Sequence, residues 1–146
     1  MLTVGTEWLI EASGCDAAAL RDAARLREVF ARAVSELALR VLGEPQWHTF
    51  PGEGGVTGLV MLTESHLACH TYPEFGVATF NLYCCRERPA WAWEERLREM
   101  LGARDVQVRS VTRSTEEFDS PSKEAHVNET HADEAQAHRR ASGGEA

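Results

Sequence analysis

The chain has 146 residues, of which 43% are hydrophobic and 26% charged, and this composition is typical of one globular domain with a packed core. Its formal net charge of −8 argues against a nucleic acid partner, because binding phosphates requires a basic surface. Most of the acidity lies in the tail, since residues 114–146 carry eight acidic and three basic side chains.

The N-terminal segment and the cysteines indicate a cytoplasmic protein. Residues 1–8 have neither the basic stretch nor the long apolar stretch of a secretory signal. The longest apolar run, residues 56–63, has the length of a strand and is too short to cross a membrane. We therefore expect no membrane partner, and we expect free thiols rather than disulfides at Cys15, Cys69, Cys84 and Cys85.

The first part of the chain predicts a strand and a long helix. Residues 6–12 are rich in bulky side chains and predict the first strand. Asp16 occupies a helix N-cap position, and apolar residues then recur at helical spacing as far as Val41. We expect one amphipathic helix over this stretch, ended by Gly43 and Pro45.

The remainder predicts four more strands and a second helix. Pro89 is suited to the first position of a helix, and the helical pattern that follows ends at Gly102. Alternating or β-branched apolar residues predict strands at residues 47–50, 56–63, 77–84 and 105–112.

This order of elements predicts an α+β fold, a two-layer sandwich of an antiparallel-rich sheet with two helices on one face. The uncovered face of such a sheet needs a partner, and a homodimer that stacks or extends the sheets would supply one. We place the domain at residues 1–113. Residues 114–146 contain almost nothing to bury beyond Phe118 and Val127, so we expect an acidic disordered tail.

Residues 62–74 bring together two acids, a hydroxyl, two histidines and a thiol, a density that packing alone does not require. One hypothesis is a metal site formed by His66, Cys69 and His70, completed by one of the later cysteines. The spacing matches no common zinc motif, and on a strand Cys69 would face away from the two histidines. We therefore predict no metal here. A further interpretation is that these side chains are ordinary residues of a sheet without a chemical role.

A hydrolytic triad is another hypothesis for the same stretch. Ser65, one of the two histidines and an acid would form the required set of groups. Neighbouring side chains on a strand diverge, however, and the Gly-x-Ser-x-Gly elbow of many hydrolases is missing. The pattern favours this hypothesis only weakly.

Three segments together resemble the small prokaryotic class of S-adenosylmethionine decarboxylase. Residues 55–76 contain Glu-Ser-His and, four residues later, His-Thr-Tyr-Pro-Glu. Residues 81–85, Asn-Leu-Tyr-Cys-Cys, follow at that family's spacing, and residues 5–16 are similar to its first strand and turn. The resemblance extends over about residues 5–112.

The resemblance implies an enzyme that matures by cutting its own chain between Glu64 and Ser65. In that family the serine hydroxyl attacks the preceding carbonyl, and elimination then converts the serine into a pyruvoyl group. Thr57 matches the position of the residue that stabilises the oxyanion during processing, and His70 matches the processing histidine.

For the mature enzyme, the resemblance implies a Schiff base between the pyruvoyl group from Ser65 and the amine of S-adenosylmethionine. Loss of CO₂ would then supply the aminopropyl donor for spermidine synthesis. Cys85 matches the proton donor, Glu74 the ligand of the ribose hydroxyls, and Phe50 is a candidate for stacking on adenine. In that family two protomers share each active site, which agrees with the half-covered sheet.

The chain departs from the family at several positions of the substrate pocket. Tyr72 replaces a common tryptophan, Asn81 a common acid, and Arg86 a small residue, while Phe50 is offset by one inserted glycine. A pyruvoyl-dependent arginine or ornithine decarboxylase of the same family is therefore an alternative. A second alternative is an inactive homologue that serves as a binding or regulatory subunit.

Overall fold

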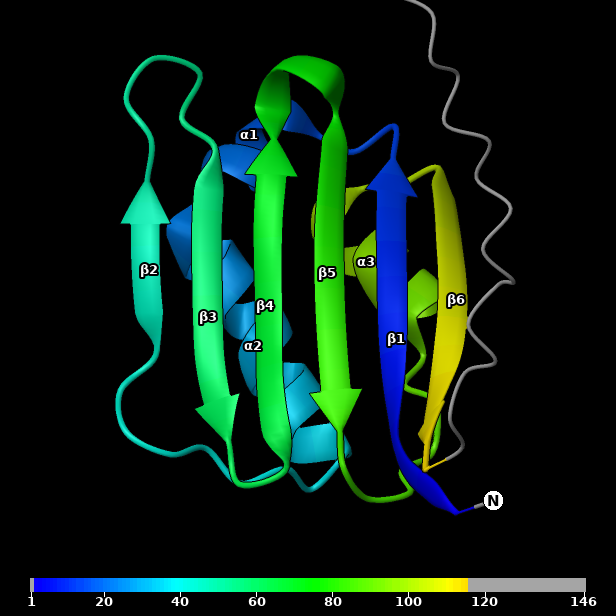
Figure 1. Ribbon diagram of the computed structural model, residues 1–146. Helices are drawn as coiled ribbons and strands as arrows, with labels where there is room; N and C mark the ends of the chain where they lie inside the picture. The colour runs from blue at the N-terminus through cyan, green and yellow to red at the C-terminus, as the bar shows by residue number, and fades with distance from the viewer. Residues whose placement is uncertain (1, 116–146) are drawn as a thin grey trace, which may run out of the picture. The chain divides into compact units, whose positions relative to one another are not determined.

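Residues 2–115 are described by the computed structural model of the chain, and they form one six-stranded sheet with three α-helices on one of its faces (Figure 1). The strand order is β2-β3-β4-β5-β1-β6, and every neighbouring pair is antiparallel. The predicted two-layer α+β sandwich is thus confirmed. The elements are β1 (Thr3–Ser13), α1 (Ala17–Arg21), α2 (Ala23–Glu36), β2 (Gln46–Thr49), β3 (Val56–Leu62), β4 (Ser65–Tyr72), the 3₁₀ turn η1 (Pro73–Phe75), β5 (Val77–Cys84), α3 (Trp93–Leu101) and β6 (Asp105–Ser114).

The core lies between the sheet and the helices. Every second residue of β3, β4 and β5 is buried on the helix side, as the period of two in a strand requires. The helices bury the matching stripe of their own surface, which includes Leu26, Val29 and Phe30 of α2. Removing one such side chain from water stabilises the fold by about 1.5–3 kcal/mol. The sheet side of the core includes Trp8, Ile10, Val60, Leu67, Phe80 and Leu82.

The single long helix predicted from Asp16 to Val41 is wrong, because the chain forms two helices that end earlier. Asp22 interrupts the pattern: its side chain accepts hydrogen bonds from the backbone N–H groups of Ala24 and Arg25, at 3.0 and 3.2 Å, and caps α2. After α2 ends, Val41 forms an isolated bridge with Leu62 at the end of β3. The helical spacing of apolar residues therefore does not decide where the helices end, because the Asp22 cap and the bridge between Val41 and Leu62 do.

The second helix also begins later than predicted, at Trp93 rather than at Pro89. Trp91 and Trp93 are both buried, and their rings meet edge to face with centroids 4.7 Å apart. Two adjoining indoles reach the core because residues 89–92 are not helical. The predicted end at Gly102 is correct, and this glycine adopts the left-handed conformation that suits a helix C-cap.

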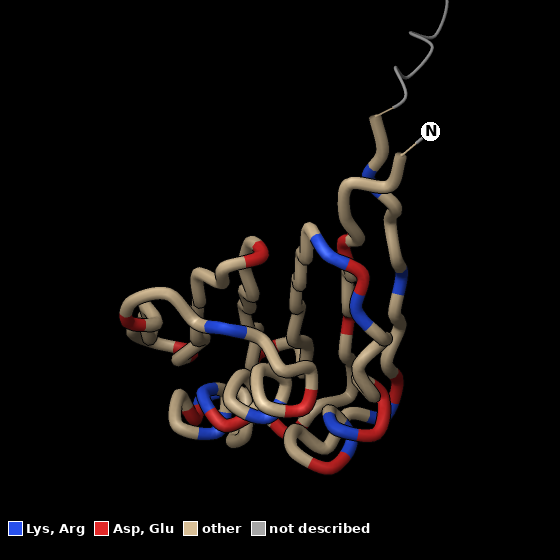
Figure 2. Tube along the Cα trace, turned by 90° about the horizontal axis from the view of Figure 1, so that it is seen from below, with Lys and Arg blue, Asp and Glu red and all other residues tan. Residues whose placement is uncertain are grey.

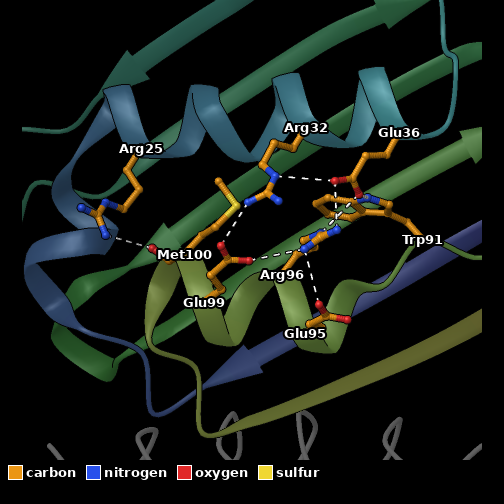
Figure 3. Close-up of polar contacts among 8 residues, drawn as sticks. All are labelled: Arg25, Arg32, Glu36, Trp91, Glu95, Arg96, Glu99 and Met100. Carbon is orange, nitrogen blue, oxygen red and sulfur yellow. Dashed lines mark hydrogen bonds and ion pairs between the residues drawn. The ribbon is translucent and has the colours of Figure 1, made fainter.

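Polar contacts join α2 to α3 on the outer side of the helix layer (Figure 3). The carboxylate of Glu36 accepts hydrogen bonds from Trp91 Nε1 at 2.6 Å and from Arg96 Nε at 3.2 Å. These donors, the indole first, hold the pKa of Glu36 below its usual value. Arg32 of α2 also reaches Glu99 of α3 at 3.3 Å. The two helices are therefore fixed to each other as well as to the sheet.

The opposite face of the sheet carries no helix in the described residues (Figure 1). In Figure 2 the charged positions lie on the helices, in the loops and on β1 and β6, whereas β2, β3, β4 and β5 contain no Lys, Arg, Asp or Glu. Met61 is 63% exposed on this face, and Leu59 is 45% exposed. A stretch of sheet without charged groups and with exposed apolar side chains, such as β2–β5 form here, is typical of a surface that binds another protein.

The tail of residues 114–146 lies outside the described residues from residue 116 onward. No helix within residues 2–115 has both the length and the apolar character needed to cross a membrane.

Candidate active site

The turn between β3 and β4 holds the Glu64–Ser65 peptide bond in an unusual conformation. Ser65 is the first residue of β4 and has a φ of 150°, a region that residues with a side chain seldom occupy. Such a conformation costs of the order of 1–3 kcal/mol and persists only where the surrounding structure imposes it. Here the strand pairings impose it, because Ser65 lies opposite Leu62 on one side and Cys84 on the other.

Glu64 is held on both its side chain and its backbone. Its carboxylate is buried, with 7% of the residue exposed, and it accepts two hydrogen bonds from the guanidinium of Arg88, one of them from Nε at 3.0 Å. Arg88 thereby lowers the pKa of Glu64. The carbonyl oxygen of Glu64 accepts a hydrogen bond from the backbone N–H of Cys85 at 3.0 Å. The carbonyl that precedes Ser65 is thus both fixed in place and polarised.

Positive charge surrounds this residue. A pocket of about 370 Å³ is lined by Arg40, Thr63, Arg86 and Arg88 together with Glu64 and Ala38. Three arginines and one glutamate therefore line the same pocket.

A chain of hydrogen bonds begins at the Ser65 hydroxyl. Ser65 Oγ lies 2.9 Å from His66 Nδ1, and His66 Nε2 lies 2.9 Å from Asn81 Oδ1. Asn81 Nδ2 donates to Glu7 Oε1 at 2.6 Å, and Arg113 donates to Glu7 Oε2 at 3.1 Å. The expectation that the Ser65 and His66 side chains diverge is wrong, because the φ of Ser65 turns its hydroxyl toward the histidine.

Sequence reasoning did not find Glu7, Asn81 or Arg113 as members of this network. Glu7 lies on β1 and Asn81 on β5, two strands that are adjacent in the sheet although 74 residues separate the pair in sequence. The only signal available was that Glu7 and Asn81 are polar residues on alternating strands.

A second polar group lies toward the other end of β4. Thr57 Oγ1 is 2.7 Å from His70 Nδ1, and the two residues face each other across β3 and β4. The His70 ring contacts two aromatic rings edge to face, Phe50 at 5.5 Å and Tyr72 at 4.5 Å between centroids. The structure therefore places three of the predicted residues, Thr57, His70 and Phe50, side by side on the uncovered face.

These two groups are far apart within one chain. Ser65 and His70 are separated by five positions of a continuous strand, which corresponds to about 17 Å at 3.3 Å per residue. Glu74 is farther still from Ser65, since it lies on the exposed turn η1 beyond the end of β4. No single chain can bring Thr57, His70 or Glu74 to Ser65 without unfolding β4.

Of the two adjacent cysteines, only Cys85 is accessible. Cys84 is the last residue of β5 and points into the core, where burial raises the pKa of its thiol to about 11. Burial likewise raises the pKa of Cys69 to about 12. Cys85 is exposed immediately after β5, next to the Glu64 carbonyl that its N–H contacts. It is therefore the thiol available for proton transfer at this site.

The residues considered for a metal do not converge. His66 and His70 point to the uncovered face of β4, whereas Cys69 is buried on the helix side. Within residues 2–115, no three His, Cys, Asp or Glu side chains lie close enough together to hold a metal ion.

Comparison with known proteins places this arrangement in a family. Residues 6–114 match the family model described as S-adenosylmethionine decarboxylase. The S-adenosylmethionine decarboxylase proenzyme of Pyrococcus abyssi is 35% identical over 121 residues, which are 82% of this chain and 85% of that protein. The arginine decarboxylase proenzyme of Aeropyrum pernix is 43% identical over 93 residues, 62% of this chain and 70% of that protein. The crystal structure of the adenosylmethionine decarboxylase from Aquifex aeolicus superposes with a TM-score of 0.68 at 28% identity, covering 82% of this chain and 98% of that one.

The Glu64–Arg88 pair generates a prediction about stability. Arg88→Met leaves the buried Glu64 carboxylate without its partner, and we expect it to reduce the free energy of unfolding by about 3 kcal/mol. Denaturant unfolding should be measured in a Ser65→Ala background, so that the cleavage implied by the family resemblance cannot occur.

Two controls separate the pair from general packing. The double variant Glu64→Gln/Arg88→Met should recover part of the loss, because it removes the unpaired charge. In the parent protein, the contribution of Glu64 should be present above a pH of about 4.5 and should be lost as the pH falls through the lowered pKa of the folded state. An Arg88→Met variant as stable as its parent would contradict this account.

Proposed function

The chain belongs to the S-adenosylmethionine decarboxylase family, and we propose that it is a self-processing, pyruvoyl-dependent decarboxylase that converts S-adenosylmethionine to the aminopropyl donor for spermidine synthesis. The observation that carries the proposal is the Glu64–Ser65 bond. A strained serine with a bonded hydroxyl follows a carbonyl that already accepts a hydrogen bond. Homologues named as proenzymes support cleavage of a precursor at such a bond.

The proposed cleavage needs only the chain and one water molecule. Ser65 Oγ attacks the Glu64 carbonyl carbon, the C–N bond breaks, and the Ser65 nitrogen takes up a proton to give an ester. Elimination then releases the Glu64 carboxylate and leaves a dehydroalanine, which water converts into a pyruvoyl group and ammonia. The pyruvoyl group would supply a carbonyl that can accept electrons during decarboxylation, a capacity that no ordinary side chain has.

The surroundings of Glu64 fit this product. Cleavage gives Glu64 a second carboxylate, at its new C-terminus, beside the pocket that Arg40, Arg86 and Arg88 line. Arg88 already binds the side-chain carboxylate of Glu64, so the guanidinium groups of Arg40 and Arg86 would offset the added negative charge. The precursor thus contains the counter-charges that the processed chain needs.

We propose that two copies share each site by stacking their uncovered sheet faces. A twofold axis that lies between the sheets and runs across the strands would place the Ser65 end of one β4 over the His70 end of the other. Thr57, His70 and Glu74 of one copy would then complete the site at the partner's Ser65. The uncharged central strands and the exposed Leu59 and Met61 support this surface as the interface.

Within the completed site, Cys85, Phe50 and Glu74 have roles suited to their positions. The exposed thiol of Cys85 can return a proton to the substrate carbon after CO₂ is lost. The ring of Phe50 is 44% exposed and can stack on adenine, and the carboxylate of Glu74 can accept hydrogen bonds from ribose hydroxyls. We further propose a cytoplasmic location, which the four free thiols support.

Self-cleavage is tested by denaturing electrophoresis and mass spectrometry of the purified protein. We expect the 146-residue chain to yield fragments of 64 and 82 residues, and we expect Ser65→Ala to remain whole. A wild-type chain that stays intact would contradict the proposal and would favour the inactive homologue.

The shared site is tested by mixing two defective chains. Ser65→Ala has no nucleophile, and His70→Ala removes the group that we assign to the partner's site. Neither variant should be cut alone. When the two are co-expressed with different tags in equal amounts, about half of the His70→Ala chains should be cut, because random pairing gives them a partner with an intact His70. If the mixture also stayed uncut, the site would not be shared.

The substrate is tested by measuring CO₂ release from S-adenosylmethionine, arginine and ornithine under identical conditions. The aromatic ring of Phe50 and the carboxylate of Glu74 suit a nucleoside, so we expect kcat/KM for S-adenosylmethionine to exceed the other two values by at least about 100-fold. The similarity to an arginine decarboxylase proenzyme favours arginine as the second candidate. A preference for arginine in this assay would replace the first proposal by that one.

A further inference from the structure

We propose that His66 is the general base that takes the proton from Ser65 Oγ in the first step of self-cleavage, and that Asn81 and Glu7 position it for this task. The inference rests on the proposed self-cleavage and concerns how the first bond is formed. His66 Nδ1 lies 2.9 Å from Ser65 Oγ, within the range that direct proton transfer requires. Within residues 2–115, no other histidine ring nitrogen lies within hydrogen-bond distance of this hydroxyl.

The hydrogen bonds beyond His66 determine which of its nitrogens carries the proton. Glu7 pairs with Arg113, and a carboxylate accepts hydrogen bonds but donates none. Asn81 must therefore turn its NH₂ group toward Glu7 and its carbonyl oxygen toward His66. That oxygen can only accept, so the imidazole donates through Nε2–H.

The consequence for Ser65 follows directly. A neutral imidazole that carries its proton on Nε2 has a free lone pair on Nδ1, and this is the nitrogen that faces Ser65 Oγ. The serine hydroxyl must then donate its own proton to His66. The network thus holds the histidine in the one neutral form that can act as a base toward Ser65.

Packing keeps the ring in this orientation. The His66 ring contacts the ring of Tyr83 edge to face, with centroids 6.1 Å apart, and the guanidinium carbon of Arg113 lies over the Tyr83 ring, 5.4 Å from its centroid. Arg113 therefore serves the network twice, through Glu7 and through Tyr83. A ring fixed by neighbours on β5 and β6 loses little further freedom when the reaction begins.

The remaining requirements of the first step are met in the same chain. As Ser65 Oγ bonds to the Glu64 carbonyl carbon, its proton passes to His66 Nδ1. The negative charge on the carbonyl oxygen is stabilised by the Cys85 N–H, which already donates to it at 3.0 Å. The C–N bond then breaks, and the proton held by His66 passes to the departing nitrogen of Ser65, so that His66 returns to its neutral form.

This assignment gives His66 and His70 different steps of the maturation reaction. His70 lies about 17 Å along β4 from Ser65 of its own chain, so it can act only at the partner's site, in the elimination that follows. The ester should therefore form without help from a second copy, and conversion to the pyruvoyl group should require one.

The test is a time course of chain cleavage after cell-free synthesis, with and without neutral hydroxylamine, which cleaves esters but leaves peptide bonds intact. We expect His66→Ala to slow the appearance of both fragments at least about 100-fold, and the accumulated chain to resist hydroxylamine, because no ester has formed. Added imidazole should restore cleavage in His66→Ala, because it can occupy the space of the lost ring. His66→Gln, which keeps a hydrogen-bond acceptor but cannot take up a proton, should be equally slow.

The positioning role has its own pair of variants. Asn81→Asp retains an acceptor for His66 Nε2–H and should mature faster than Asn81→Leu, which removes it. Gln107→Leu removes an amide of the same kind from the exposed edge strand β6 and should mature like the wild type, since this side chain does not join the network.

The outcomes are distinguishable from a failure of the proposed function. An intact wild-type chain would refute self-cleavage itself. If the wild type is cut, then wild-type cleavage of His66→Ala, or a His66→Ala chain that hydroxylamine divides, would refute the assignment of His66 to the first step. Failure of imidazole to restore His66→Ala, when circular dichroism shows it folded, would also count against proton transfer and favour a structural role.

Discussion

The register of β4 against β3 and β5 is the constraint on which the rest of the site depends. It places Ser65 opposite Cys84, and thereby brings the Cys85 N–H to the Glu64 carbonyl. The same register sets His70 opposite Thr57 on β3. A shift by one residue would turn both histidines into the core and the buried Leu67 and Cys69 into solvent, so the hydrophobic core itself fixes the chemistry.

The strain at Ser65 is maintained by the structure on either side of it. The serine would relax from its φ of 150° if the turn before it could move. That movement is resisted by the buried bond between Glu64 and Arg88 and by the ladder of β4 with its two neighbours. Stabilising interactions are therefore concentrated around the bond that we propose is cleaved, and they hold its two residues in place.

Charged side chains are unevenly distributed over the elements of the fold. Ion pairs join α2 to α3 on the outer side of the helices, and carboxylates of β1 pair with guanidinium groups of β6. Strands β2–β5 carry none of these groups, which leaves an uncharged face around His66 and His70. One chain contains the nucleophile with its hydrogen-bonded histidine and, about 17 Å away, the groups that we assign to a second chain. Under the shared site that we propose, this separation makes association of two copies a condition for a complete site.

Local patterns in the sequence determined much of this protein. Alternation of apolar residues predicted strand β5 with its observed bounds, because a half-buried strand requires a period of two. The motif around residues 64–74 predicted the family, since its residues are close in sequence and independent of how the chain folds. The same locality explains the errors: helical spacing continued past Asp22 and Glu36, where a cap and a strand partner ended the helices.

Tertiary structure alone decided which residues of the site contact one another. Glu7 meets Asn81 only because β1 inserts between β5 and β6, a choice that depends on the whole sheet. The contact between Ser65 and His66 depends on one backbone angle that the neighbouring strands impose. The distance between Ser65 and His70 likewise follows from β4 being straight and fully paired. These two contacts and this distance all result from long-range strand pairing. The free energy of that pairing is spread over many residues, so no single segment of the sequence predicts it.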